Sequence, residues 1–454
     1  MKGFKPYNPK QIYFLPPSPT DWLPENHLAY FIDEVIDALD LRPFYQDYEG
    51  ESRGQPPFDP AMMLKIITYG YCTGCFSSRR LEAKLREDLP FIYLAGGNRP
   101  DHRTIAAFRQ RHRQRIHDLF VQVLQIAQKA GLVRLGHVAL DGTKIKAHAS
   151  RHKAMSYGRM KKVLPELERE VAELLRQAEE TDAREEAEAP KKATSLPEEL
   201  ARREQRLARI RAAMAALEAR AREEQEQESL AERSKAKKKK RDRSGPPPQD
   251  PPAPPEKAQY NFTDPESRIM LDNSTKAYVQ AYNVQLAVDA KSQLIVGGLV
   301  SNQAADSPHL PKLVTEVKKN LGRFPREVSA DAGYFSDDNL KFLYRHEIEG
   351  YLAFKKIKHG EKLPSAPRGR IPVNLSLKDR MRRKLCTKKG QQRYALRKIT
   401  VEPVIGQIKR VLGFVQFLTR GLKNVMAEWD WVMLAHNLRK LWGKRAKLLP
   451  LLVR

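Results

Sequence analysis

More than a hundred residues without a strand pattern separate the first strand-like segment of this chain from the next one. The first segment, His137–His148, is an apolar run that reaches Asp141 and continues with Ile145 and Ala147 alternating with polar residues. This pattern is typical of a buried strand. The next such segment begins near Tyr278. A sheet that uses both segments must therefore accommodate a long insertion after its first strand.

The insertion has the pattern of a helical hairpin. Apolar residues recur at spacings of three and four in two halves, with a break near Pro190, and this predicts an antiparallel coiled pair. The seam residues are Leu164, Leu167, Val171, Leu174 and Ala178 in the first half and Leu200, Leu207, Ile210, Met214 and Leu217 in the second.

A basic tract and a proline-rich tract follow the hairpin. Lys235–Arg243 holds seven basic residues in nine, and Ser244–Pro255 holds seven prolines in twelve. Such composition cannot build a core, so we expect a disordered linker. The basic tract is either a DNA contact or a solvated tail, and the sequence leaves both open.

The segments after Tyr278 alternate between strand and helix. Together with His137–His148 they give the order strand, strand, strand, helix, strand, helix, strand, helix, which matches a ribonuclease-H-like domain interrupted after its first strand. We therefore predict an α/β protein whose mixed-sheet core carries a coiled-coil helical insertion. The predicted elements are strands 282–288 and 294–300 around a turn at 289–292, helix 309–320, strand 327–332, helix 337–346, strand 350–354 and a helix from about Ala395.

The amino-terminal part is predicted to be helical. Amphipathic stretches span 28–39, 60–71, 79–85 and 105–130. The turn Pro100–Thr104 and the basic residues Arg103, Arg109 and Arg111 fit a helix-turn-helix that enters a DNA groove. An ordinary helical bundle with a solvated basic face is an equal alternative.

The net charge of +27 must be balanced by counterions or by an anionic partner, for which nucleic acid is the first candidate and membrane the second. No apolar run approaches the roughly 18–20 residues of a membrane span, and residues 1–14 lack the apolar core of a signal peptide. We expect a soluble cytoplasmic protein with no membrane contact. Cys72 and Cys75 lie in an apolar run and are predicted to be buried rather than reactive.

Three acidic residues have the order and setting of a metal site for phosphodiester chemistry. Asp141 lies in the first strand, Asp331 in the strand before Ala332 and Gly333, and Glu402 on the late helix. In the inferred fold the first and fourth strands are parallel neighbours, so the two aspartates can share a metal. Carboxylate oxygens are the ligands of Mg²⁺, and two ions about 3.5–4 Å apart activate the attacking oxygen and stabilise the leaving one.

The chain resembles the bacterial insertion-sequence transposases of the DDE class, which have a helical amino-terminal domain and a ribonuclease-H-like core. The segments that carry the resemblance are 140–147, 330–334 and 394–409. The last is similar to the family signature of a tyrosine, an arginine, the catalytic glutamate and a lysine. It maps these roles onto Tyr394, Arg397, Glu402 and Lys409, although the gap before Glu402 is one residue longer than usual and leaves Lys398 as an alternative basic residue.

The resemblance implies Asp141, Asp331 and Glu402 as catalytic metal ligands, Mg²⁺ or Mn²⁺ as cofactor with two ions per site, and double-stranded DNA as substrate. The DNA would be the terminal inverted repeats of the element and a target, held by a homodimer. Cleavage at the element ends would precede joining to the target. The alternatives are a nuclease on the same core and a non-catalytic DNA-binding regulator derived from a transposase.

Other residues compete for functional roles. Lys378–Lys398 holds ten basic residues and one acidic residue in 21, enough for several phosphate contacts. Trp429–Trp442 is predicted to cover the core. Asp272, Asp289 and Asp306 are expected in loops or turns, and His148 and His152 at the surface. The predicted domains are a DNA-binding helical domain over 1–130, the first core strand over 131–155, the hairpin and linker over 156–260, and the remaining core over 261–454.

Overall fold

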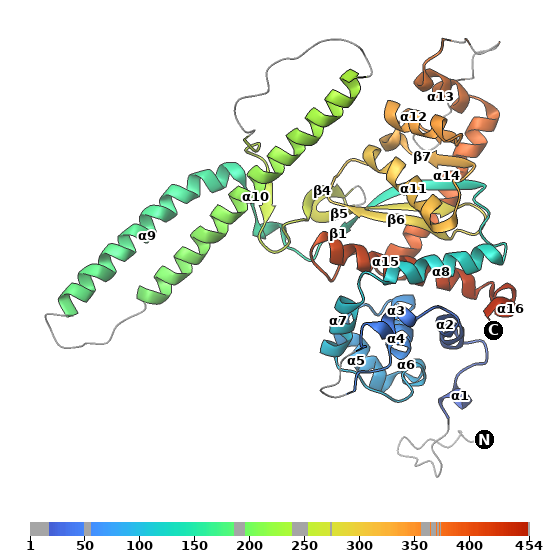
Figure 1. Cartoon of the computed structure of the whole chain (residues 1–454), viewed down its shortest axis with the longest axis horizontal. Helices are drawn as coiled ribbons and strands as arrows, with labels where there is room; N and C mark the ends of the chain where they lie inside the picture. The colour runs from blue at the N-terminus through green and yellow to red at the C-terminus, as the bar shows by residue number, and fades with distance from the viewer. Residues whose placement is uncertain are drawn as a thin grey trace, which may run out of the picture. The chain divides into compact units, whose positions relative to one another are not determined.

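The fold was analysed in a computed structural model of the chain. The residues that it describes are 18–49, 56–185, 196–237, 253–272, 275–355, 364, 369, 372 and 374–452. They fall into two compact units (Figure 1). The core unit comprises Met1–Ile145 and Asn283–Arg454, and the insertion unit comprises Lys146–Tyr282.

In the described residues before β1, the core unit has eight helices. The predicted helix 105–130 is two helices, because a turn at 112–115 interrupts it. Arg115 in this turn forms an ion pair with Asp47, and its Nε donates to the Asp47 carboxylate at 2.9 Å, which fixes the chain away from the helical path. The helices are α1 (Pro19–Trp22), α2 (Leu28–Asp37), α3 (Arg42–Gln46), α4 (Pro60–Cys72), α5 (Ser78–Glu87), α6 (Leu89–Leu94), α7 (His102–Arg111) and α8 (Ile116–Lys129).

Cys72 and Cys75 are buried free thiols, as predicted. Burial raises the pKa of the Cys72 thiol to about 12, so this group stays protonated at neutral pH. The Cys72 Sγ faces the carbonyl oxygen of Ala435 at 3.6 Å. Cys72 therefore does not supply a reactive thiolate.

A mixed sheet forms the centre of the core unit. Its order is β5, β1, β7, β8, with β6 on β5; β1 and β7 are parallel, as are β7 and β8, whereas β5 and β6 are antiparallel. The parallel pairing of the first and fourth core strands confirms the expected ribonuclease-H-like arrangement. The strands are β1 (His137–Lys146), β5 (Ala277–Asp289, of which Asn283 onward belongs to the core unit), β6 (Ile295–Ser301), β7 (Glu327–Ala330) and β8 (Glu349–Leu352).

Helices that follow the strands cover this sheet. The predicted helix from Ala395 begins earlier, at Lys388, because Thr387 caps it by accepting the N–H of Gly390 at 3.0 Å. The basic tract Lys378–Lys398 covers a separate helix and the start of this one. The helices are α11 (Leu310–Leu321), α12 (Asp337–Arg345), α13 (Leu377–Leu385), α14 (Lys388–Gly406), α15 (Leu422–Trp442) and α16 (Leu449–Leu452), with the short turns η2 (Ser307–His309), η3 (Ala332–Tyr334) and η5 (Arg445–Lys447) and the π-helix η4 (Gln407–Val411).

Helix α15 joins the amino-terminal helices to the sheet. It packs on α4 and α8 and also on β6, and its fully buried residues include Trp429. Trp431 stacks on Tyr71 of α4 with the ring centroids 5.7 Å apart. The prediction that 429–442 covers the core is therefore confirmed. No helix among the described ranges combines the length and apolarity needed to cross a bilayer.

A partly buried histidine ties three helices of the core unit together. His117 of α8 contacts Asp430 of α15 at 3.1 Å and Glu316 of α11 at 2.9 Å. Burial disfavours the imidazolium, but the two carboxylates outweigh this effect and raise the pKa of His117 to about 10. The cluster is therefore a charged one at neutral pH.

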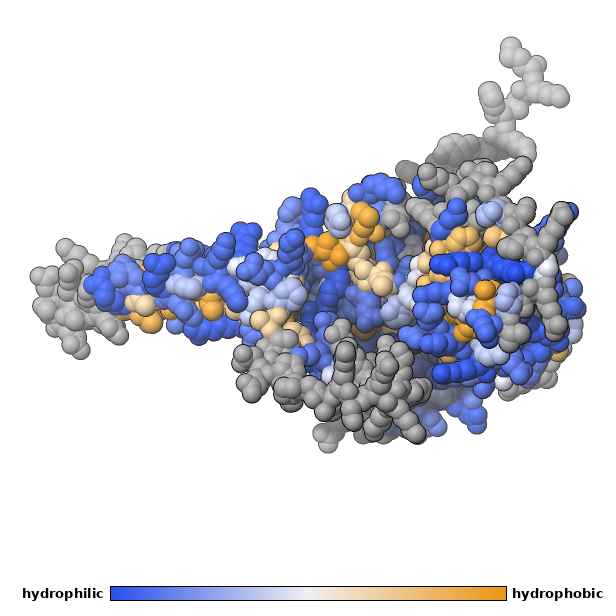
Figure 2. Space-filling model, turned by 90° about the horizontal axis from the view of Figure 1, so that it is seen from above, coloured by the Kyte–Doolittle hydropathy of each residue, from blue (hydrophilic) through white to orange (hydrophobic). Residues whose placement is uncertain are grey.

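The insertion unit contains the predicted hairpin. Its helices pack along a seam that buries Leu167, Val171, Leu207, Ile210 and Leu217, and hydrophilic residues cover most of their visible surface (Figure 2). The elements are α9 (Tyr157–Glu185), α10 (Leu196–Lys237), the turn η1 (Arg151–Lys153), the antiparallel pair β2 (Ala154–Ser156) and β3 (Gln259–Asn261), and β4 (Arg268–Asp272), which pairs with the first part of β5.

Three predictions for the insertion lie outside the described residues. These are the break near Pro190, the proline-rich tract Ser244–Pro255 except for its last residues, and most of the basic tract Lys235–Arg243.

We predict that His117→Gln destabilises the protein in a pH-dependent way. The folded pKa lies above the unfolded value, so the stabilisation is complete below pH 6.5 and is lost as the pH rises toward 10. Removing one partner of a buried ion pair costs about 3–5 kcal/mol. Thermal melts of wild type and variant should differ most near pH 6 and converge near pH 10. The exposed His148→Gln serves as the control, and a difference that stays constant with pH would contradict the assignment.

Candidate active site

Asp141 lies on the central strand of the sheet. The four residues before it in β1 are buried, and its own side chain is 16% exposed. Its Oδ1 accepts the N–H of Gly142 at 2.9 Å, which orients the carboxylate. The apolar run that predicted the strand therefore holds this carboxylate at the edge of the core.

Asp331 lies one residue beyond its strand rather than within it, because β7 ends at Ala330. Asp331 caps the turn η3 instead, and its carboxylate accepts the N–H of Gly333 at 2.9 Å. The register pairs Ala139 with Ser329, so Asp141 and Asp331 each lie two residues past a matched pair. Parallel pairing therefore brings the two carboxylates to the same edge of the sheet.

Arg397 of α14 links two of the predicted acids. Its Nη1 donates to Asp141 Oδ2 at 2.7 Å and its Nη2 donates to Glu402 Oε1 at 2.9 Å. The Arg397 side chain is 11% exposed, whereas the Glu402 side chain is 49% exposed. The guanidinium thus lies between a carboxylate of the sheet and a carboxylate of the helix.

The protonation of these acids is set by burial and by Arg397. Burial raises the pKa of Asp141 to about 7; the Arg397 charge opposes this shift and the nearby Asp331 charge adds to it. Burial also raises the pKa of Asp331, again against Arg397. For Arg397, burial lowers the pKa, but the nearby charges, of which that of Asp141 is the largest, together outweigh burial and raise the pKa. The carboxyl groups of the site therefore need a nearby cation to stay ionised.

The other residues of the predicted signature surround this cluster. The ring of Tyr394 lies 6.0 Å from the Arg397 guanidinium, and Lys398 is exposed. Glu402 lies on α14, which ends at Gly406, and Lys409 lies on the π-helix η4 that follows it directly. The Lys409 Nζ donates to the carbonyl oxygen of Lys144 on β1, at 2.9 Å.

Sequence reasoning missed a polar network beside the acids. Asp306, expected in a loop, lies just before η2 and accepts Nδ2 of Asn283 at 2.9 Å and Nε2 of Gln285 at 2.8 Å. The hydroxyl of Tyr334 donates to Gln285, and Lys144 lies 3.5 Å from Asp306. The polar residues within the otherwise apolar strand 282–288 were the signal available for this network.

The comparisons with known proteins identify two domains. Residues 17–111 match the family described as Transposase domain (DUF772), and residues 251–438 match the family described as Transposase DDE domain. The chain is a transposase of the DDE class. No curated protein and no solved structure matches it.

The donor set of this transposase fits the divalent ions that the family generally uses. Asp141, Asp331 and Glu402 supply carboxylate oxygens, which suit Mg²⁺ or Mn²⁺, and the raised pKa of the buried Asp141 shows that its negative charge lacks full compensation. Within the described residues, however, no three acidic, histidine or cysteine side chains converge as a ready-made metal site. Arg397 holds Asp141 and Glu402 by hydrogen bonds instead.

The three amino-terminal arginines have different settings in the transposase. Arg103 and Arg111 are exposed on α7, and the Arg111 guanidinium lies 4.5 Å from the Tyr48 ring. Arg109 points inward, where its Nη1 donates to the carbonyl oxygen of Phe76 at 2.8 Å. Arg109 therefore has a structural contact, and its assignment to DNA stays a prediction.

We predict that Gly142→Ala disturbs the polar network. A Cβ on Gly142 would lie 2.4 Å from the Gln285 Nε2 and 2.8 Å from the Asp306 Oδ1. Overpacking of this kind costs about 1–3 kcal/mol. The thermal melting temperature should fall by several degrees, whereas Gly136→Ala, whose Cβ would meet nothing within 4 Å, should leave it unchanged. Equal melting temperatures for the two variants would contradict the packing described here.

We also predict that Arg397→Gln strengthens the response of the protein to Mn²⁺. In the variant, the carboxylates of Asp141 and Glu402 lack their guanidinium partner. A divalent ion then binds these carboxylates without having to displace Arg397. Half-maximal thermal stabilisation should require several-fold less Mn²⁺ than in wild type. Lys398→Gln removes the same charge from an exposed neighbour and should respond as wild type does; an unchanged Mn²⁺ response in Arg397→Gln would refute the competition.

Proposed function

We propose that this transposase cleaves DNA at the ends of its element and joins the freed ends to target DNA, with Asp141, Asp331 and Glu402 as the catalytic metal ligands. The observation that carries the proposal is the convergence of Asp141 and Glu402 on one guanidinium, Arg397, although they are far apart in the sequence. Asp331 lies at the same edge of the sheet by the register of β1 and β7.

The roles of the three acids follow from their settings. Asp141, within β1, and Asp331, just after β7, each accept a backbone N–H, so their carboxylates are pre-positioned. Glu402 is more exposed than the two aspartates, and its carboxylate is therefore the most accessible of the three to a substrate. Two bound divalent ions would supply the Lewis acidity that activates the attacking oxygen and stabilises the leaving oxygen.

The basic residues around the acids would hold the substrate. Once Arg397 releases a carboxylate, its planar guanidinium can pair with a phosphate in two hydrogen bonds. Lys409 lies beside β1 and is placed to add a second cation, and the exposed Lys398 extends the positive surface. These residues would orient the phosphodiester for in-line attack.

The remaining parts of the chain complete the proposal. We propose that the helical region 1–130 binds the terminal repeats, that 131–155 and 261–454 form the catalytic core, and that 156–260 is an insertion. Two copies of the chain would hold the two element ends as a homodimer. The exposed Arg103 and Arg111 are the amino-terminal residues best placed for phosphate contact.

We predict that Asp141→Asn, Asp331→Asn and Glu402→Gln each abolish metal-dependent cleavage and joining while leaving DNA binding in place. Labelled DNA that carries the element ends should be incubated with unlabelled target in Mg²⁺ or Mn²⁺ and resolved on denaturing gels. Asp338→Asn, an exposed acid on α12, is the matched control and should keep full activity.

The products separate the proposed activity from its alternatives. Cleavage without joined products would indicate a nuclease on the same core. Binding without cleavage by wild type would indicate a DNA-binding regulator and would refute the proposed reaction.

A further inference from the structure

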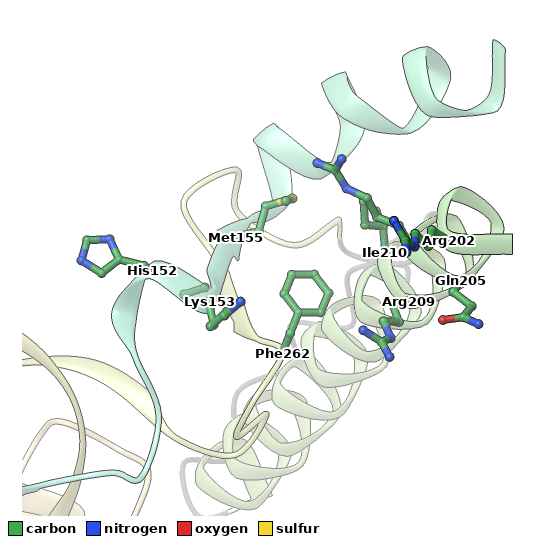
Figure 3. Close-up of a pocket in the computed structure, with 10 residues that line it drawn as sticks. His152, Lys153, Met155, Arg202, Gln205, Arg209, Ile210 and Phe262 are labelled. Carbon is green, nitrogen blue, oxygen red and sulfur yellow. The ribbon is translucent and has the colours of Figure 1, made fainter. Parts of the chain in front are cut away.

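The insertion unit contains a cavity that none of the roles above uses. Its volume is about 490 Å³, within the roughly 300–1,000 Å³ of pockets that hold small ligands. The strand β2 and the turn before it form one wall, and α10 forms a second. Phe262, the residue after β3, forms the third (Figure 3).

The floor of the cavity is apolar. Met155, Ile210 and Phe262 line it, and the Phe262 ring lies between Lys153 and Arg209 in the view of Figure 3. Phe262 is only half-buried, so its ring remains partly available to a ligand. The accessible part of an aromatic ring can stack on nucleic-acid bases without regard to sequence.

The rim of the cavity is basic. Arg202, Arg206 and Arg209 lie at spacings of four and three on α10, so they project from one face of the helix. Lys153 adds a fourth cation from the turn before β2. Among the described residues that line the cavity, none is acidic.

Other arginines of α10 serve the hairpin itself. Arg203 forms an ion pair with Glu170, and Arg211 forms one with Glu168, both on α9. For Arg206 and Arg209, in contrast, the described part of the chain provides no acidic partner. The helix thus separates arginines that hold the hairpin together from arginines that surround the cavity.

We propose that this cavity binds an unpaired nucleotide of the DNA substrate, with the base against Phe262 and the flanking phosphates on Arg206, Arg209 and Lys153. Phosphate contacts from the rim supply affinity, and the apolar floor selects a base that is not paired in a duplex. The inference rests on the proposed function only in taking DNA as the substrate.

The test measures DNA binding by the full chain in EDTA, where metal-dependent cleavage does not occur. Fluorescence anisotropy compares a labelled duplex interrupted by a short unpaired thymidine tract with the fully paired duplex. Arg206→Gln/Arg209→Gln should weaken binding of the interrupted probe at least about fivefold. Loss of two phosphate contacts on a single strand should also reduce the slope of log K against log salt by about 1.4.

Two further variants give the control and the base-specific readout. Lys162→Gln/Arg222→Gln removes the same charge from exposed positions of the hairpin outside the cavity and should bind both probes as wild type does. Phe262→Leu keeps an apolar side chain but no stacking surface, and it should weaken the interrupted probe while the paired duplex binds normally.

These binding measurements test the role of the cavity separately from the proposed cleavage reaction. The proposal is overturned if Arg206→Gln/Arg209→Gln binds the interrupted probe with wild-type affinity. It is also overturned if Phe262→Leu binds both probes more weakly by the same factor. Absence of cleavage by wild type in Mg²⁺ would refute the proposed function, yet it would leave this binding result standing.

Discussion

The parallel pairing of β1 with β7 is the constraint on which the candidate site depends. Hydrogen bonds between these strands match Ala139 with Ser329, and the chain reaches an aspartate two residues later on each side. Because both strands run in the same direction, both carboxylates emerge at one edge of the sheet. The insertion between β1 and β5 leaves this pairing intact, since it returns the chain to the sheet through β4 and the first part of β5.

Placing carboxylates at this edge has an electrostatic cost, which Arg397 offsets. Burial alone would favour the neutral acid at Asp141, and the neighbouring Asp331 strengthens that tendency. The guanidinium restores part of the lost charge stabilisation and at the same time ties Glu402 of α14 to β1. The Arg397 side chain thus links α14 to the sheet and lies between two of the proposed metal ligands.

The amino-terminal helices and the sheet share a hydrophobic centre through α15. Trp429 is fully buried, and Trp431 stacks on Tyr71 from α4. His117 adds a charged link between α8, α11 and α15. These contacts join the amino-terminal helices to the sheet within one compact unit.

Local sequence patterns determined the strands of the core unit, most helices, the hairpin seam and the covering role of 429–442, because burial imposes a period that each segment shows by itself. They did not predict the short strands β2, β3 and β4 of the insertion unit. They also selected Asp141, Asp331 and Glu402 as candidates, whose catalytic roles stay predictions. Only the tertiary structure decided that Arg397 contacts Asp141 and Glu402 while Lys398 is exposed, and that Lys409 donates to a backbone carbonyl oxygen of β1. It also brought Asp306 beside the acids and assembled the basic cavity of the insertion. Such contacts join residues far apart in the chain, and no short-range pattern records them.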